Sequence, residues 1–258
     1  MNYPNTYSFN SYVDWHENTI ESDNDLVQKL NQHMELLKQN TDRLLYLSQL
    51  LDKINTVLLR AKQTNGEDIE LFNCNILLQA QILPYRYHEI FKSIESIVDK
   101  LWRKNKDTTD YITVENINSR IKDLIRSSVI VSTHSYAKDF SRTLNDWRRV
   151  FEINSIAPDD YQDISEIIVE QEAKMASGYF AYHVDVVYND GVHVEIQIYS
   201  QLNEIWRSLS HKLYEKTRLQ QNVEHGHGTS ASRLVSLGHL LHLAECEAER
   251  LHDDLGNN

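Results

Sequence analysis

Three polar side chains, His193, Glu195 and Gln197, alternate with apolar ones along the run Val192–Ile198. Successive side chains of a strand point to opposite faces, so this run presents a carboxylate on a rigid strand while its apolar residues enter a core. The sequence Asn189-Asp190-Gly191 is typical of a tight turn and joins the run to a preceding alternating segment. We therefore predict a β-hairpin with polar side chains on the face that points away from the core.

The expected pairing of this hairpin brings two acidic residues together. If the turn closes as predicted, His183 lies opposite Gln197 and Asp185 lies opposite Glu195. Two facing carboxylates destabilise a sheet unless a cation lies near them, and a divalent metal ion would remove the conflict. The alternative is an amphipathic hairpin whose polar face is simply exposed to water, and the hairpin alone leaves both interpretations open.

A second group of polar residues follows Pro84 at helical spacing. Its members are Lys92, Ser96, Lys100 and Arg103. This spacing places them on one face of a helix. Three cations and a hydroxyl suit a polyphosphate, whose oxygens accept hydrogen bonds from lysine and arginine, although a basic stripe is also typical of a solvated surface.

A third candidate, Asp123, precedes the apolar run Val129–Val131, which we expect to form a buried strand. A carboxylate just before a strand is well placed to be a second metal ligand. After the hairpin, apolar residues at helical spacing from Trp206 to Leu213 predict a helix that carries His211. A hydrogen-bonded structural role is an equal alternative for this histidine.

Composition excludes several classes of protein. At 258 residues and 41% hydrophobic content, the chain can bury a sizeable core, and its net charge of −12 argues against non-specific coating of nucleic acid. Cys74 and Cys246 are isolated, so no disulfide framework or zinc site is indicated. No apolar leader follows Met1 and no run is long and apolar enough to span a bilayer, so we expect a cytoplasmic protein without a membrane partner.

Residues 1–84 predict a helical extension. Leucines recur at heptad spacing from Leu30 to Leu58, with polar interruptions at His33 and Asn40, which predicts one long helix from about Asp25 to Ala61. The interruptions shorten the seam and favour packing within the chain over packing on a second copy. A second helix is expected to follow Gly66 and to end near Pro84.

The remaining chain divides into a mixed core, residues 85–218, and a C-terminal part, residues 219–258. The C-terminal part is expected to hold a loop and then a helix capped by Thr229 or Ser230. His225 and His227 lie in that loop, where two histidines beside glycines are more often solvated than bound to metal.

Five segments, taken in order, resemble the synthetase domain of the RelA/SpoT family. They are Lys92–Arg103, Lys122–Arg126, Gly178–His183, Val194–Ile198 and Ser210–Tyr214. The resemblance spans about half the chain and implies an α+β fold, with a mixed β-sheet of the nucleotidyltransferase type between N- and C-terminal helices. It also implies transfer of the β,γ-pyrophosphate of ATP to a ribose 3′-hydroxyl, with GDP or GTP as acceptor in most members.

The resemblance also implies roles for individual residues. Asp123 and Glu195 match the ligands of Mg²⁺, and Glu195 matches the candidate base for the 3′-hydroxyl. The residues that match the ATP-phosphate loop and the following helix are Lys92, Ser96, Lys100 and Arg103. Those that match the acceptor site are Tyr179, which stacks on the base, and His183, Gln197 and His211.

The chain departs from the family pattern at several positions. An arginine is usual at Ile90 and often found near Ser128, Arg-Thr is usual at Tyr199-Ser200, and glutamate is common at Ser210. The affinity for ATP and the identity of the acceptor are therefore open. Arg86 or Arg126 is a candidate to replace a lost cation at the ATP site.

Three functions follow from these observations. The first is a small alarmone synthetase that makes guanosine tetra- or pentaphosphate and has no segment resembling the family's hydrolase. The second is a toxin that pyrophosphorylates the 3′ end of tRNA and is restrained by an antitoxin or another regulatory protein. The third is a nucleotide-binding pseudoenzyme that uses its helical extension for assembly, including homo-oligomer formation. Retention of Asp123 and Glu195 favours the two enzymes but does not separate them.

Overall fold

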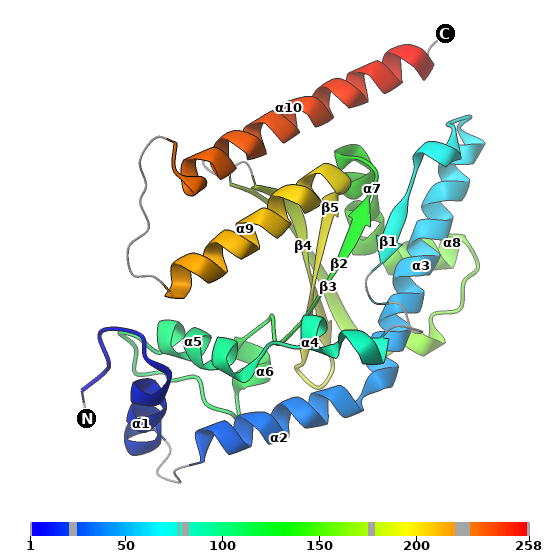
Figure 1. The fold of residues 1–258 in the computed structure, drawn as a ribbon. Coiled ribbons are helices and arrows are strands. Elements are labelled where there is room, and N and C mark those ends of the chain that lie inside the picture. The colour runs from blue at the N-terminus through cyan, green and yellow to red at the C-terminus, as the bar shows by residue number, and fades with distance from the viewer. Residues whose placement is uncertain are drawn as a thin grey trace.

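A mixed five-stranded sheet forms the centre of the protein in a computed structural model that describes residues 2–20, 25–76, 78, 83–174, 179–219 and 228–256 (Figure 1). In spatial order the strands are β1 (Cys74–Ile76), β2 (Ile125–Val131), β5 (His193–Ser200), β4 (Tyr179–Tyr188) and β3 (Ile164–Lys174). β2 and β5 are parallel, and the other neighbours are antiparallel. Helices flank this sheet, so the expected α+β architecture is confirmed.

The predicted hairpin is formed by β4 and β5. Gly191 has a φ of +78°, which a glycine adopts without strain, and its backbone N–H donates to the carbonyl of Tyr188 at 2.9 Å. His183 pairs with Gln197 and Asp185 pairs with Glu195, so the predicted register is confirmed.

The apolar face of the sheet lies under helix α7 (His134–Asn145), which contacts β2, β3, β4 and β5. Val194, Ile196 and Ile198 of β5 are fully buried in the main core on this side. Helix α3 (Thr41–Thr64) packs on α7, and α8 (Trp147–Ile153) and the short η3 (Asp159–Tyr161) follow α7 in the chain. The alternation of the hairpin therefore leaves its polar side chains on the opposite face.

Helix α9 (Gln201–Leu219) crosses one end of that opposite face and contacts β2, β4 and β5, which confirms the helix expected after the hairpin. A small buried cluster of Ile130, Ala181 and Tyr199 lies on this face. Helix α10 (Ser230–Gly256) packs on α9, and the Oγ1 of Thr229 accepts a hydrogen bond from the backbone N–H of Ser232 at 3.3 Å. The predicted cap is confirmed.

The N-terminal helices differ from the prediction of one long helix, which is wrong. After α1 (Phe9–Thr19), the chain forms α2 (Leu26–Gln39) and α3, with a break at Asn40. Asn40 has a non-helical ψ of 68°, and its side chain accepts a hydrogen bond from the N–H of Arg43, so the residue caps α3. The seam nevertheless packs within the chain, as favoured, because Leu30 and Leu44 are at most 1% exposed.

The prediction of a helix between Gly66 and Pro84 is also wrong. The chain forms the short η1 (Ile69–Leu71) and then β1, which pairs with the edge of β2 and places Cys74 opposite Val131. This pairing gives hydrogen-bond partners to backbone N–H and C=O groups that would be unpaired if β2 were an edge strand. The local sequence of residues 74–76 does not reveal this pairing. The sheet thus takes one strand from before residue 84, where the sequence placed the end of the helical extension.

Three short helical segments and α5 connect β1 to β2 and complete the described elements. They are η2 (Leu83–Arg86), α4 (Tyr87–Ile90), α5 (Ile94–Lys104) and α6 (Ile117–Arg120). Helix α5 packs against α1 and α2. Within the described residues, no helix is long and apolar enough to cross a membrane.

Candidate active site

The polar face of the sheet is built in rows by strand register. Across β2, β5 and β4, one row contains Arg126, Glu195 and Asp185, and the next contains Ser128, Gln197 and His183. Partners in register point to the same face of a sheet. The following row, Ile130, Tyr199 and Ala181, is buried, so the rows with Glu195 and Gln197 form the floor of the candidate site.

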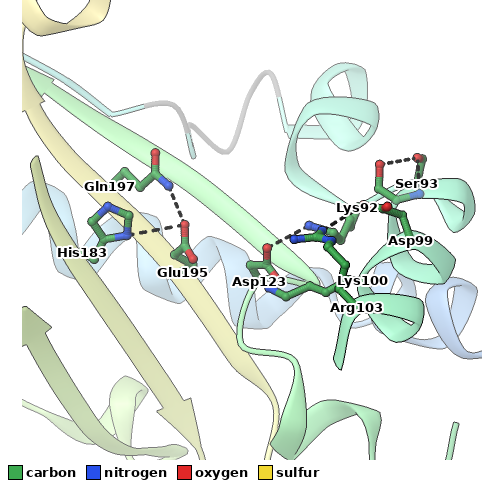
Figure 2. Close-up of polar contacts among 10 residues, drawn as sticks. Lys92, Ser93, Asp99, Lys100, Arg103, Asp123, His183, Glu195 and Gln197 are labelled. Atoms are coloured by element: carbon green, nitrogen blue, oxygen red, sulfur yellow. Dashed lines mark hydrogen bonds and ion pairs between the residues drawn. The ribbon is translucent and has the colours of Figure 1, made fainter. Parts of the chain in front are cut away.

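Glu195 lies at the centre of this floor. Its Oε1 accepts a hydrogen bond from Nε2 of Gln197 at 2.6 Å, and Nδ1 of His183 lies 3.9 Å from the same oxygen (Figure 2). The Glu195 side chain is 23% exposed, so it is partly sheltered and still accessible. The structure therefore brings together three of the residues that the sequence predicted.

Asp185, which faces Glu195, has two side-chain partners of its own. Its carboxylate lies 2.9 Å from Nζ of Lys122 and 2.8 Å from Nδ1 of His193. The hydrogen bond to Asp185 is the largest cause that raises the pKa of Lys122. The conflict between the facing carboxylates is thus relieved by Lys122, a long-range partner, without requiring a metal ion between them.

Asp123 lies just before β2, as expected, and is enclosed by two lysines. Its Oδ2 lies 2.8 Å from Nζ of Lys92, and its Oδ1 contacts Nζ of Lys100 (Figure 2). The backbone N–H of Lys92 donates to the carbonyl of Leu124 at 2.9 Å, which fixes this segment beside the start of β2. The ion pairs therefore join the residues before α5, α5 itself and the entry to β2.

Burial and charge at this cluster shift two pKa values. Burial alone would raise the pKa of Asp123, but Lys92 and Lys100 outweigh it and lower the pKa from 3.8 to about 2. Burial lowers the pKa of Lys92, and the charges of Lys100 and Arg126 add to this effect against the attraction of Asp123. Arg126 therefore belongs to the same positive cluster.

The prediction that Lys92 lies on the face of a helix is wrong. Helix α5 begins at Ile94 because Ser93 caps it, with its Oγ accepting from the N–H of Ser96 at 3.3 Å. Lys92 lies in the segment before the helix, while Ser96 and Lys100 lie on it. Arg103, one turn after Lys100, is engaged with Asp99 on its own helix at 2.9 Å.

The other predicted residues are placed as follows. Tyr179 begins β4, but its side chain and Gly178 lie outside the described residues, as do His225 and His227. His211 is an exposed residue of α9. Sequence reasoning missed the network of Lys122, Asp185 and His193 because its members meet only through the sheet. The adjacency of Lys122 to Asp123 and the hairpin register were the available clues.

The two positions that lack the usual family arginines are both buried. Ile90 is 2% exposed and Ser128 is 3% exposed. Arg86 pairs with Glu89 at 3.3 Å, while Arg126 stands beside Glu195 in the sheet register. Of the two candidate replacements, Arg126 is therefore the one on the floor of the site.

The carboxylates of Asp123 and Glu195 have the chemistry to hold a Mg²⁺ ion together with phosphate. Mg²⁺ prefers oxygen and is commonly held by one or two carboxylates with phosphate oxygens and water. Asp123 lies three residues before Arg126, at most about 11 Å along the chain, and Arg126 pairs with Glu195. In the described part of the chain, no group of three or more metal-binding side chains could hold an ion without such a partner.

These features define an α+β protein whose mixed sheet carries Glu195 on its polar face, with Asp123 and a pair of lysines at the entry to β2. The family model for the "Region found in RelA / SpoT proteins" matches residues 90–220, half of the chain and the part that contains these side chains. The chain belongs to the RelA/SpoT family.

Solved structures show similarity over most of the chain. Small alarmone synthetase 1 from Bacillus subtilis is 18% identical, with 72% of this chain and 81% of that chain covered and a TM-score of 0.45. A GTP pyrophosphokinase family protein from Streptococcus pneumoniae is 19% identical, with coverages of 82% and 91% and a TM-score of 0.47. Small alarmone synthetase 2 from B. subtilis is 19% identical, with coverages of 82% and 97% and a TM-score of 0.46. No curated protein matches the sequence.

Proposed function

We propose that the protein is an ATP-dependent pyrophosphokinase that transfers the β,γ-pyrophosphate of ATP to the 3′-hydroxyl of GDP or GTP. The observation that carries this proposal is that the family match, residues 90–220, contains both candidate carboxylates and the lysine cluster beside them. Catalysis of phosphoryl transfer depends mainly on positioning and on stabilising charge, which are the two properties this face supplies.

The lysine cluster is the proposed site for the ATP phosphates. Lys92 and Lys100 project from different segments to one point, and Arg126 contributes charge from β2. Ammonium and guanidinium groups form strong charge-assisted hydrogen bonds with phosphate oxygens. Ser96 and Arg103 extend the same site along α5, as the family resemblance implies.

Glu195 is proposed to orient the acceptor hydroxyl and to take its proton. The 3′-oxygen forms a bond to the β-phosphorus of ATP, the bond from that phosphorus to the α,β-bridging oxygen breaks, and AMP leaves. Gln197 holds one oxygen of Glu195 at 2.6 Å, which fixes the direction of the carboxylate. A Mg²⁺ ion held by Asp123 and Glu195 would neutralise phosphate charge when bound.

The acceptor is proposed to enter a pocket of about 290 Å³ next to Glu195. Its lining includes Lys122, His183 and Asp185, with Glu195 at one side. Lys122 and Asp185 form an ion pair at 2.9 Å, so this wall offers an acceptor both a positive and a negative group. Tyr179 is proposed to stack on the acceptor base, and His183, Gln197 and His211 to support its binding.

Transfer of label tests the proposal. ATP labelled in its terminal phosphate is offered with magnesium and, in separate reactions, with GDP, GTP or deacylated tRNA. We expect label on a guanine nucleotide and its loss in Glu195→Gln. Label on tRNA alone would replace the proposed acceptor with the 3′ end of tRNA, and ATP binding without transfer in every reaction would contradict an enzymatic function.

A further inference from the structure

Both oxygens of Asp123 are occupied within the protein itself. Lys92 takes Oδ2 at 2.8 Å, and Lys100 takes Oδ1. The three side chains are sheltered from water, with 15% of Asp123, 9% of Lys92 and 21% of Lys100 exposed. Breaking one partner from a sheltered ion pair leaves an uncompensated charge, which is strongly unfavourable. A metal ion therefore reaches Asp123 only if a lysine finds another acceptor.

Glu195, on β5, differs from Asp123 in its partners. Among the described residues its one ion-pair partner is His183, at 3.9 Å, and its hydrogen bond comes from the neutral amide of Gln197. Within the part of the chain that the structure describes, no ammonium group lies within hydrogen-bond distance of this carboxylate, unlike that of Asp123. The obstruction to a cation is therefore specific to Asp123.

A polyphosphate changes the balance at Asp123. Its oxygens offer Lys92 and Lys100 new charge-assisted hydrogen bonds, and Asp123 then loses the cations that compensate its charge. A divalent cation that binds with the phosphates then takes the place of the two lysines as the positive partner of Asp123. A divalent cation that binds alone has to displace a lysine from Asp123, and that lysine then finds no phosphate to accept its hydrogen bonds. The cation is also repelled by the positive charges of Lys92, Lys100 and Arg126.

We propose that Lys92 and Lys100 form an ionic lock on Asp123, so that the protein binds a divalent cation and a polyphosphate together and binds the cation alone only weakly. This inference rests on the proposed function, which assigns the lysines to phosphate and Asp123 to metal. It gives each lysine a second task, because the ammonium group that binds phosphate also withholds Asp123 from the metal until phosphate arrives.

Equilibrium dialysis of Mn²⁺ against the full chain tests the lock directly, with and without a non-hydrolysable ATP analogue. We expect weak binding of Mn²⁺ alone by the unmodified protein and clearly tighter binding when the analogue is present. In Lys100→Met, Mn²⁺ alone should bind at least about tenfold more tightly, because one ammonium group no longer opposes it. Adding Asp123→Asn to this variant should remove the gain.

Lys38→Met is the matched control, since Lys38 pairs with Glu35 at 2.7 Å on α2 and with no carboxylate of the site among the described residues. It should leave the affinity for Mn²⁺ alone unchanged. Thermal unfolding checks that each variant is folded, and Lys100→Gln replaces Lys100→Met if the latter is not. Unchanged Mn²⁺ affinity in the folded Lys100 variant, or equal Mn²⁺ affinity with and without the analogue in the unmodified protein, would overturn the lock.

The label-transfer reaction separates this inference from the proposed function. Transfer by the unmodified protein together with an unchanged Mn²⁺ affinity in Lys100→Met would overturn the lock and leave the function standing. A tighter affinity for Mn²⁺ in Lys100→Met, lost on adding Asp123→Asn, would support the lock even if no acceptor received label.

Discussion

Asp123, in the turn before β2, and Glu195, on β5, are two carboxylates with different surroundings. Asp123 is paired with two lysines, whereas Glu195 receives a hydrogen bond from Gln197 and has a more distant histidine. The two ammonium groups favour the ionised form of Asp123, and the amide of Gln197 holds one oxygen of Glu195 in place. In the proposed function, these surroundings suit Asp123 to balancing charge and Glu195 to orienting the acceptor hydroxyl.

The ion pairs of Asp123 make the free energy of unfolding depend on pH in the acid range. The pKa of Asp123 in the folded chain, about 2, lies below its ordinary value of 3.8, so its contribution is fully present above that ordinary value. It should be lost as the pH falls from about 4 to 2. Urea unfolding in metal-free buffer measures this as a difference between the unmodified protein and Asp123→Asn. A difference that stays constant over that range would contradict the assignment.

Gln197 is expected to act on the reaction through Glu195. Replacing it with alanine leaves the carboxylate without its 2.6 Å hydrogen bond and free to turn, so kcat should fall by about tenfold while the KM for ATP is little changed. Steady-state kinetics of transfer checks this split. Gln201→Ala, which removes the same group from an exposed position on α9, is the control. An equal effect of both substitutions would contradict a role through Glu195.

The hairpin is the element that the sequence predicts best, because its information is local. Alternation along Val192–Ile198 and the turn at Asn189–Gly191 determine the faces and the register, and both are confirmed. The break at Asn40 was visible only as a polar residue in a leucine seam. β1 was missed because it is a strand only through its partner β2, and Lys122 meets Asp185 only across the folded sheet.

Gly191 is expected to matter through its backbone conformation. Its φ is +78°, and a Cβ atom there would meet nothing within 4 Å, so substitution affects conformation and not packing. Gly191→Ala should lower the free energy of unfolding by about 1 kcal/mol, and Gly191→Asn by less, because asparagine tolerates this region better. Denaturant unfolding measures both. Equal stability of the alanine variant and the unmodified protein would contradict the turn.

The whole molecule joins segments that the sequence treated as separate parts. Leu44, Leu47 and Leu51 of the helical extension are at most 1% exposed in the common core, and β1 forms one edge of the sheet. At the other end, the Nε1 of Trp206 on α9 donates to the carbonyl of Leu234 on α10 at 2.9 Å. The residues around the site therefore depend on packing from both ends of the chain.

A chain that begins at residue 85 should not fold on its own. It would lack β1 and the leucines that cover the core on the side of α3, and the exposed apolar surface should cause aggregation. Circular dichroism during heating checks for a cooperative transition in the shortened and full chains. A shortened chain that unfolds cooperatively and transfers pyrophosphate would show that residues 1–84 are a separable domain.

The central claim is that this face transfers pyrophosphate with Glu195 at the acceptor. The most direct measurement is to separate the nucleotides formed from ATP and GDP or GTP by the full chain and by Glu195→Gln. We expect AMP and a pyrophosphorylated guanine nucleotide in equal amounts, with the rate lowered at least about 100-fold in the variant. Formation of ADP in place of AMP, or an equal rate in the variant, would contradict the claim.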